Sequence, residues 1–324
     1  MGTQTIKSRA LMMCALLAFV PLLRAQTYPS RPITIVVPLA AGDSGDIAAR
    51  AIGEELSRIL KTPVVTANRP GAGGALAAET VAKAAPDGYT ILFTQNSSLT
   101  YRPVTEQQTV PYDPLKDLTP LGLTSRSPMV LAVRRDAPYR TFKELTEFAK
   151  ARRGQVRLGT PGSGSASDFS INLMNALTDA GLVSVPFNGA SPAVNALRGE
   201  HIEGVVLTLG VVLGHIRSGA LRGLTASDKM KDLPEVPTMQ EIGYPQGIFG
   251  VWFAFLAPSG TSPEVVRVLV PAIRTVSQSP AIVEKLSALG IIEEYAPPES
   301  VTIRIREEQH ALRSLLKSRD ASLK

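Results

Sequence analysis

The fold is decided by residues 33–74, which read ITIVVPLAAGDSGDIAARAIGEELSRILKTPVVTANRPGAGG. An apolar β-branched run at 33–37 is followed by a glycine-containing loop and by apolar residues at helical spacing from Ile47 to Ile59. A second short run, 63–66, leads into a loop with three glycines. This order predicts parallel strands in a sheet with helices on both faces.

The same alternation continues along the chain and starts again after Ser127-Pro128. Thr141 and Glu144 have the spacing of a capping box, and Ser191-Pro192 is expected to begin another helix. In the last helix, an amphipathic stripe from Val301 to Leu316 is expected to pack on the first lobe. Further strands are expected at 90–94, 129–133, 156–160, 202–208, 221–225 and 251–256.

The N-terminus has the features of a secretory signal peptide. Lys7 and Arg9 precede an apolar run of about 14 residues, and a small residue, Ala25, closes the segment. The run is shorter than the roughly 20 residues of a membrane-spanning helix, which disfavours an uncleaved anchor. We expect cleavage after residue 25 and export to the periplasm.

The only cysteine, Cys14, lies inside that apolar run, so a lipid anchor is not expected. The remaining chain has no cysteine for a disulfide, a thiol nucleophile or a metal site. Removal of residues 1–25 lowers the formal net charge from +6 to +3. Because basic residues are not clustered with aromatic ones, we expect no nucleic-acid partner. The length of the exported chain indicates about two domains, and we expect a monomer.

Three loops share one design: a strand end, then glycines and hydroxyls, then a helix start. They are residues 39–46, 68–74 and 161–167. In open α/β sheets such loops meet at the carboxyl ends of the strands, where ligands bind. Glycine lets backbone N–H groups approach a ligand, and helix N-termini add unpaired donors. The loops therefore predict a site for an anion that needs no arginine. The alternative is ordinary turns, with Ser44, Ser165 and Ser191 as N-caps.

Enzymatic chemistry finds little support in the sequence. Residues 162–167, GSGSAS, are neither a nucleophile elbow nor a dinucleotide loop. His201, His215 and His310 lie outside the three loops, and no metal-ligand spacing occurs, so neither a cofactor nor a metal is expected. A serine hydrolase remains an unsupported alternative. Trp252 and its aromatic neighbours indicate a core strand, with ligand stacking as the second interpretation.

Several short motifs together resemble one family. They are Tyr28-Pro29-Ser30-Arg31-Pro32-Ile33, Val37-Pro38, Asn68-Arg69-Pro70-Gly71-Ala72-Gly73-Gly74, Ala85-Pro86-Asp87-Gly88-Tyr89-Thr90, Pro111-Tyr112-Asp113-Pro114, Leu233-Pro234-Glu235-Val236-Pro237-Thr238 and Leu256-Ala257-Pro258-Ser259-Gly260-Thr261. In this order they resemble the Bug receptors, the periplasmic binding components of tripartite tricarboxylate transporters, from about Tyr28 to the C-terminal helix.

The resemblance implies an α/β type II periplasmic binding protein fold, with a ligand cleft between two lobes and two crossovers. It places lobe I at 26–127 and 253–324 and lobe II at 128–252. Ligand would be captured by hinge closure and delivered to a membrane permease, without catalysis. A sensor that feeds a signalling partner is the alternative.

The resemblance and the loops together give a set of expected ligand-binding residues. Some depart from the family pattern: Asp43 replaces a glycine, Asp168 a histidine, Phe187-Asn188 a Tyr-Lys pair and Leu207-Thr208 an Asp-Asn pair. Asp46 is expected to have a structural role. The expected binding residues are Leu39, Ala40, Gly42, Asp43, Ser44, Ala72, Gly73, Gly74, Gly162, Ser163, Gly164, Ser165, Phe187, Asn188, Leu207 and Thr208.

These departures bear on the ligand. A carboxylate at Asp43 would repel an anionic ligand, most strongly in a closed cleft with little water. An apolar residue at Leu207 removes a partner for a ligand ammonium group. We therefore expect a small organic acid or related amide, such as a monocarboxylate or a more apolar acid, and not a dicarboxylic amino acid.

Overall fold

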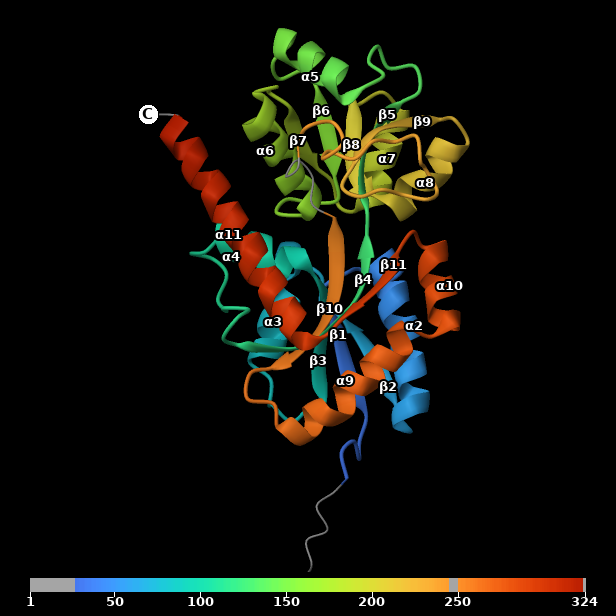
Figure 1. Ribbon diagram of the computed structural model, residues 1–324, viewed down its shortest axis with the longest axis vertical. Coiled ribbons are helices and arrows are strands. Elements are labelled where there is room, and N and C mark those ends of the chain that lie inside the picture. Colours follow the sequence, from blue (N-terminus) through green and yellow to red (C-terminus); the bar gives the residue numbers. More distant parts are fainter. Residues whose placement is uncertain (1–26, 245–249, 323–324) are drawn as a thin grey trace, which may run out of the picture.

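The computed structural model describes residues 27–244 and 250–322, and these form two sheets. The predicted leader and its cleavage site lie outside the described residues. Figure 1 shows the two sheets one above the other along the long axis. The six-stranded sheet has the order β11-β4-β10-β3-β1-β2 and the five-stranded sheet the order β7-β6-β8-β5-β9. Their strands are β1 Ile33–Val37, β2 Val64–Asn68, β3 Thr90–Gln95, β4 Leu118–Ser127, β5 Met129–Arg134, β6 Arg157–Thr160, β7 Val183–Pro186, β8 Gly204–Thr208, β9 Leu221–Ala226, β10 Val251–Pro258 and β11 Ile292–Ala296.

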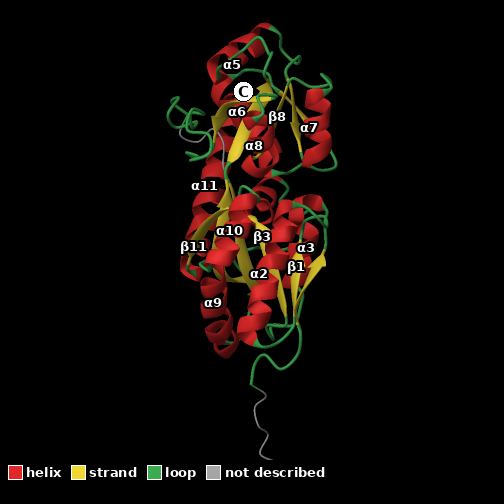
Figure 2. Ribbon diagram, turned by 90° about the vertical axis from the view of Figure 1, so that its right-hand side faces the viewer, coloured by secondary structure: helices red, strands yellow, loops and turns green. Residues whose placement is uncertain are grey.

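Each sheet and the helices packed on it form one α/β lobe (Figures 1 and 2). In the first lobe, which contains the six-stranded sheet, side chains of β1 alternate between two hydrophobic clusters, with Ile35 in one and Val36 in the other. Helices therefore cover both faces of this sheet. The first-lobe helices are α2 Ser44–Leu60, η1 Ala72–Gly74, α3 Ala75–Ala82, η2 Ser97–Tyr101, α4 Arg102–Thr105, α9 Pro263–Ser277, α10 Pro280–Ala288 and α11 Pro298–Ser322; the second-lobe helices are α5 Phe142–Ala151, α6 Ala166–Thr178, α7 Ala190–Arg198 and α8 Leu209–Arg217.

Both sheets are mixed, whereas the sequence predicted a parallel sheet. Strand β1 is parallel to β2 and β3, and β6 is parallel to β7 and β8. Strand β10 is antiparallel to β3 and β4, and β5 is antiparallel to β8 and β9. The chain enters the second lobe by β5 and re-enters the first by β10, while β11, which is also antiparallel to its neighbour β4, follows α10 within the first lobe. A strand that arrives from the other lobe does not need the helical crossover that parallel pairing requires.

The chain changes sheet between β4 and β5, with only Pro128 between the two strands. It returns between Ala226, where β9 ends, and Val251, where β10 begins. The eight expected strands are confirmed, while β4, β7 and β11 were not predicted. The division into lobes at 127/128 and 252/253 stays a prediction.

Two predicted helix starts have different outcomes. The Thr141 side chain accepts a hydrogen bond from the Glu144 backbone N at 3.1 Å, so the predicted cap of α5 is confirmed. The predicted start at Ser191-Pro192 is wrong, because α7 begins at Ala190 with Gly189 as its N-cap. Gly189 has a φ of 107°, a conformation that glycine adopts at little cost, and the proline is tolerated in the first turn.

Strand β10 is buried along its whole length, which confirms the core-strand interpretation of Trp252. Only 1 % of Trp252 is exposed, and its indole Nε1 donates to Glu308 Oε1 on α11 at 2.6 Å. Asn96 donates its Nδ2 to the Gly250 carbonyl and to the Tyr101 hydroxyl, each at 3.0 Å. Asn96 Oδ1 and Glu308 Oε2 are then two buried acceptors without a hydrogen-bond donor.

Burial raises the pKa of Glu308, against the opposing effects of the Trp252 hydrogen bond and the Arg304 charge. The folded state therefore binds this proton more tightly than the unfolded chain does. The resulting stabilisation is present below the ordinary pKa of 4.5 and is lost as the pH rises through the raised pKa of the folded protein.

A Glu308→Gln substitution tests this buried acid. The amide keeps an acceptor for Trp252 but carries no charge at any pH, so we expect its melting temperature relative to wild type to rise between pH 5 and pH 7.5. Thermal unfolding followed by circular dichroism measures this difference. Glu307→Gln, at the exposed neighbouring position, is the control and should show no such trend. A pH-independent difference for Glu308→Gln would contradict the raised pKa.

Candidate ligand-binding site

The first predicted loop connects β1 to α2 and is held by Asp46. This carboxylate is 1 % exposed and accepts hydrogen bonds from Gly42 N at 2.9 Å, Arg50 Nε at 3.0 Å and Asn68 Nδ2 at 2.7 Å. Burial alone would raise the pKa of Asp46, but these three hydrogen bonds and the Arg50 charge lower it. The expected structural role of Asp46 is therefore confirmed.

Asp43 precedes α2 as its N-cap, but its side chain makes no capping hydrogen bond. The side chain is exposed, and burial of part of it, together with the charge of Asp46, raises the pKa of Asp43. Gly42 and Ala40 are also exposed. The side chain of Ser44 lies outside the described residues.

The second predicted loop is the turn before α3, in which Gly71, Ala72, Gly73 and Gly74 all have positive φ. Gly74 is packed between the end of β1 and the turn η2. A Cβ atom there would be 3.1 Å from Ser98 Cβ and 3.2 Å from Pro38 Cβ. A larger residue would push the turn away from β1 and from η2. The loop therefore needs glycine both for its backbone conformation and for its close packing.

The third predicted loop, between β6 and α6, repeats the design of the first. Asp168 accepts a hydrogen bond from Gly164 N at 2.9 Å and another from Ser184 Oγ at 2.5 Å. The Ser165 side chain caps α6 by accepting from Asp168 N at 3.2 Å. Asp168 thus holds its own loop, as Asp46 does four residues after Gly42. These two carboxylates accept hydrogen bonds from the N–H groups of Gly42 and Gly164, which the sequence had predicted to be available to an anionic ligand.

The second and third loops, one from each lobe, lie against each other. A Cβ atom on Gly73 would lie 3.1 Å from the Gly164 carbonyl oxygen, so the two backbones approach closely. Beside them, the Tyr101 and Phe169 rings stack with centroids 4.9 Å apart. The sequence prediction that these loops share one site gains geometric support from this contact.

The contact also includes residues that sequence reasoning missed, namely Tyr101, Arg102, Glu106 and Phe169. A Cβ atom on Gly73 or on Gly164 would overlap the Arg102 side chain. The signal that could have found them was the polar run 96–98 directly after β3, which has hydroxyls but lacks the glycines that identified the other loops. Here the chain makes a π-helical turn, Ser97–Tyr101, a form that often occurs at functional sites.

The remaining predicted residues are placed less uniformly. Leu39 is partly buried against the core. Leu207 is 1 % exposed and belongs to the core of the second lobe, and the Phe187 side chain packs against the same core. Ligand contact at these two positions stays a prediction for their backbone atoms only. Asn188 and Ser163 are exposed, and Thr208 is the N-cap of α8 without a side-chain capping bond.

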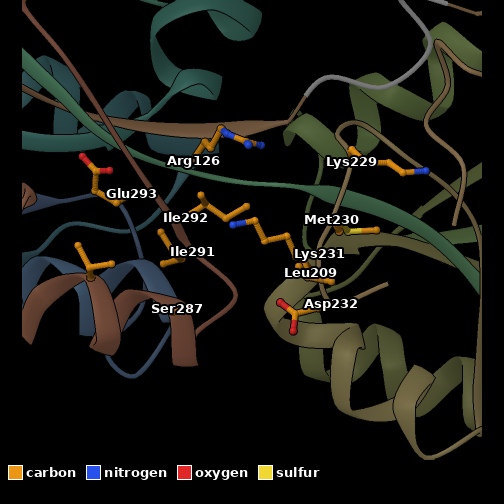
Figure 3. A pocket seen from close by; sticks show the side chains of 11 residues that line it. Arg126, Leu209, Lys229, Met230, Lys231, Asp232, Ser287, Ile291, Ile292 and Glu293 are labelled. Carbon is orange, nitrogen blue, oxygen red and sulfur yellow. The ribbon is translucent and has the colours of Figure 1, made fainter. Parts of the chain in front are cut away.

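A separate cavity of about 350 Å³ lies between the lobes near the β4–β5 crossover (Figure 3). Arg126 of β4 lies at its edge and forms ion pairs of 3.0 Å with Asp228 and with Glu294. Nearby, Gly210 of α8 lies against the Leu289–Gly290 turn so closely that neither glycine has room for a Cβ atom. None of the predicted binding residues lines this cavity.

Neither a metal site nor a membrane-spanning helix is found among the described residues. Within 27–244 and 250–322, no group of three His, Cys, Asp or Glu side chains could hold a metal ion. No helix in these ranges is long and apolar enough to cross a membrane.

A family model described as the tripartite tricarboxylate transporter family receptor matches residues 48–319. The chain belongs to this family. Its relative BugT of Bordetella pertussis is 35 % identical over 302 residues, which are 93 % of each chain. The family consists of periplasmic solute-binding receptors, so the chain is a binding protein and not an enzyme.

Solved structures of such receptors show the same fold. The periplasmic binding protein BugD matches with a TM-score of 0.79 and 31 % identity, over 90 % of this chain and 98 % of BugD. MatC from Rhodopseudomonas palustris, with bound malate, matches with a TM-score of 0.79 and 29 % identity, over 89 % and 99 % of the two chains. A second R. palustris protein, with adipate, has a TM-score of 0.80 and 27 % identity, over 90 % and 97 %.

The role of Asp168 can be tested by Asp168→Ala. The change leaves the Gly164 N–H and the Ser184 hydroxyl without their acceptor, and we expect a loss of about 1–3 kcal/mol in the free energy of unfolding. Urea denaturation measures it. Asp136→Ala removes an exposed carboxylate of the same lobe, paired with Arg134, and should cost less than about 1 kcal/mol. Equal losses would show that Asp168 does not hold the loop.

Proposed function

We propose that this receptor captures a small organic acid in the periplasm by closing its two lobes, and delivers it to a permease of the tripartite tricarboxylate type. The observation that carries the proposal is the approach of Gly73 in the first lobe to Gly164 in the second. Loops from both lobes thus contribute to one site, and ligand bound there stabilises the closed arrangement. The bound malate and adipate of the related structures support the carboxylate class.

The ligand chemistry is tested by calorimetric titration against malate, adipate, citrate, benzoate, nicotinate, nicotinamide, aspartate and glutamate. We expect binding of at least one organic acid without an ammonium group, and weaker binding of the two amino acids. The exposed carboxylate of Asp43 and the apolar Leu207 offer a ligand ammonium group no buried acidic partner. Tight aspartate binding would contradict this ligand class, and recovery of a chemically altered ligand would contradict a binding function.

Closure is tested by Gly164→Ala. The added methyl group overlaps the Arg102 side chain at the contact between the lobes, which we take to be part of the closed form, so we expect affinity for the acid to fall about 10-fold or more, because less of the protein reaches the binding-competent state. X-ray scattering should show a smaller ligand-induced compaction than in wild type.

Gly154→Ala is the matched control for this variant. Gly154 has a similar positive φ, 80° against 69° at Gly164, but has no atom within 4 Å of the added methyl group. The backbone strain is then comparable, and only the contact between lobes differs. If both variants bind the acid as wild type does, closure at Gly164 is not part of binding.

A further inference from the structure

Arg102 lies where the two lobes meet, and it follows η2 as the first residue of α4. It is only 9 % exposed. The positions of the missing Cβ atoms show that its side chain runs beside Gly73, from the first lobe, and that its Nη1 lies against Gly164, from the second lobe. A buried cation thus stands between the two glycine loops that form the proposed binding site.

The hydrogen bonding of this guanidinium is incomplete. Its Nη2 pairs with the Glu106 carboxylate, one helical turn further along the chain. Its Nε is buried and has no hydrogen-bond acceptor. A buried donor of this kind is costly, and in proteins it is commonly satisfied by a ligand, an ion or an ordered water.

Nε and Nη2 together form the side of a guanidinium that binds a carboxylate through two parallel hydrogen bonds. Glu106 occupies one of these two positions. Its Oε1 would lie 3.1 Å from a Cβ atom on Gly164, so this carboxylate also reaches the contact between the lobes. Glu106 is about one-third exposed and can move away toward solvent.

We propose that Arg102 anchors a carboxylate of the bound organic acid, and that Glu106 holds the same guanidinium when no ligand is present. This assignment rests on the proposed function and names a specificity-determining residue of that site. The incoming carboxylate takes Nε and displaces Glu106 from Nη2. No covalent bond forms or breaks; one anionic partner of the guanidinium replaces another.

The state of the loop amides strengthens the assignment. Gly42 N donates to Asp46 and Gly164 N donates to Asp168, so these two donors are not open to a ligand. Backbone amides alone then provide less stabilisation for an anion than the glycine pattern implied. The exposed carboxylate of Asp43 on the first loop adds repulsion. A cation at the lobe contact compensates for both effects.

The test uses the full exported chain and calorimetric titration with malate, adipate and benzoate. For an acid that wild type binds, we expect Arg102→Gln to weaken binding by about 10-fold or more, since a hydrogen-bonded buried charge pair is lost. Arg102→Lys keeps the charge but loses the two parallel N–H donors of the guanidinium. We expect its affinity for the acid to lie between those of wild type and Arg102→Gln. Glu106→Gln removes the competing carboxylate and should bind several-fold more tightly than wild type.

The matched control is the pair Arg58 and Glu54, which has the same i,i+4 spacing but lies exposed on α2. Arg58→Gln and Glu54→Gln change the net charge equally and should leave affinity unchanged. Circular dichroism melts identify variants that do not fold. If Arg102→Gln fails to fold, Glu106→Gln decides: unchanged or weaker binding overturns the assignment.

The outcomes separate this assignment from the proposed function. Wild type that binds none of the acids overturns the proposed ligand class and the anchor together. Wild type that binds an acid, with unchanged affinity in both Arg102→Gln and Glu106→Gln, overturns the anchor alone. Equal loss in Arg102→Gln and Arg58→Gln shows a general charge effect and also overturns it.

Discussion

Close approach of backbone to backbone, at points without side chains, is the constraint on which the arrangement of the two lobes depends. Gly73 meets Gly164 at the predicted binding loops, and Gly210 meets the Leu289–Gly290 turn near the β4–β5 crossover. At the second point a Cβ atom would overlap the backbone of the other lobe, and at the first a Cβ atom on Gly73 would lie 3.1 Å from the Gly164 carbonyl oxygen. The lobes therefore touch through turns whose positions are set by the sheets, and at the first of these points the Arg102 side chain also packs against both glycines.

In each lobe one glycine loop, that of Gly42 or that of Gly164, is held by an aspartate that accepts a hydrogen bond from the glycine N–H. Asp46 and Asp168 occupy equivalent places, in the first turn of a helix and four residues after the glycine whose N–H they accept. The local positive potential of a helix N-terminus favours a carboxylate there. Consequently the loops are already ordered before ligand arrives, and less conformational entropy is lost on binding. The same hydrogen bonds reduce the number of free amides, which gives a buried side chain such as Arg102 more influence over what binds.

Much of the fold could be predicted from the sequence, because buried strands such as 251–256 are apolar over their whole length and 33–37 is β-branched throughout with one polar residue, Thr34. Strand β4, residues 118–127, escaped prediction, since it combines a glycine, a proline and polar residues and is defined by its partners β10 and β11. The glycine loops were recognisable because positive φ and close packing require one residue type. Arg102 could not be recognised from the sequence, because an arginine that follows a polar run is expected at the surface. Its burial becomes apparent only with the π-helical turn of η2. Leu207 shows the opposite failure: a motif position was assigned to the cleft, while strand alternation directs its side chain into the core.

The single residue between β4 and β5 has a consequence for recognition by other proteins. With Pro128 alone between two hydrogen-bonded strands, the connection has almost no slack, and proline restricts it further. The lobes can then adopt few relative orientations, and the outer surface of the molecule has correspondingly few shapes. Under the function proposed above, a membrane permease would distinguish loaded from empty receptor by outline alone. It would not need to contact the cargo, so one docking surface could serve receptors whose cargo differs.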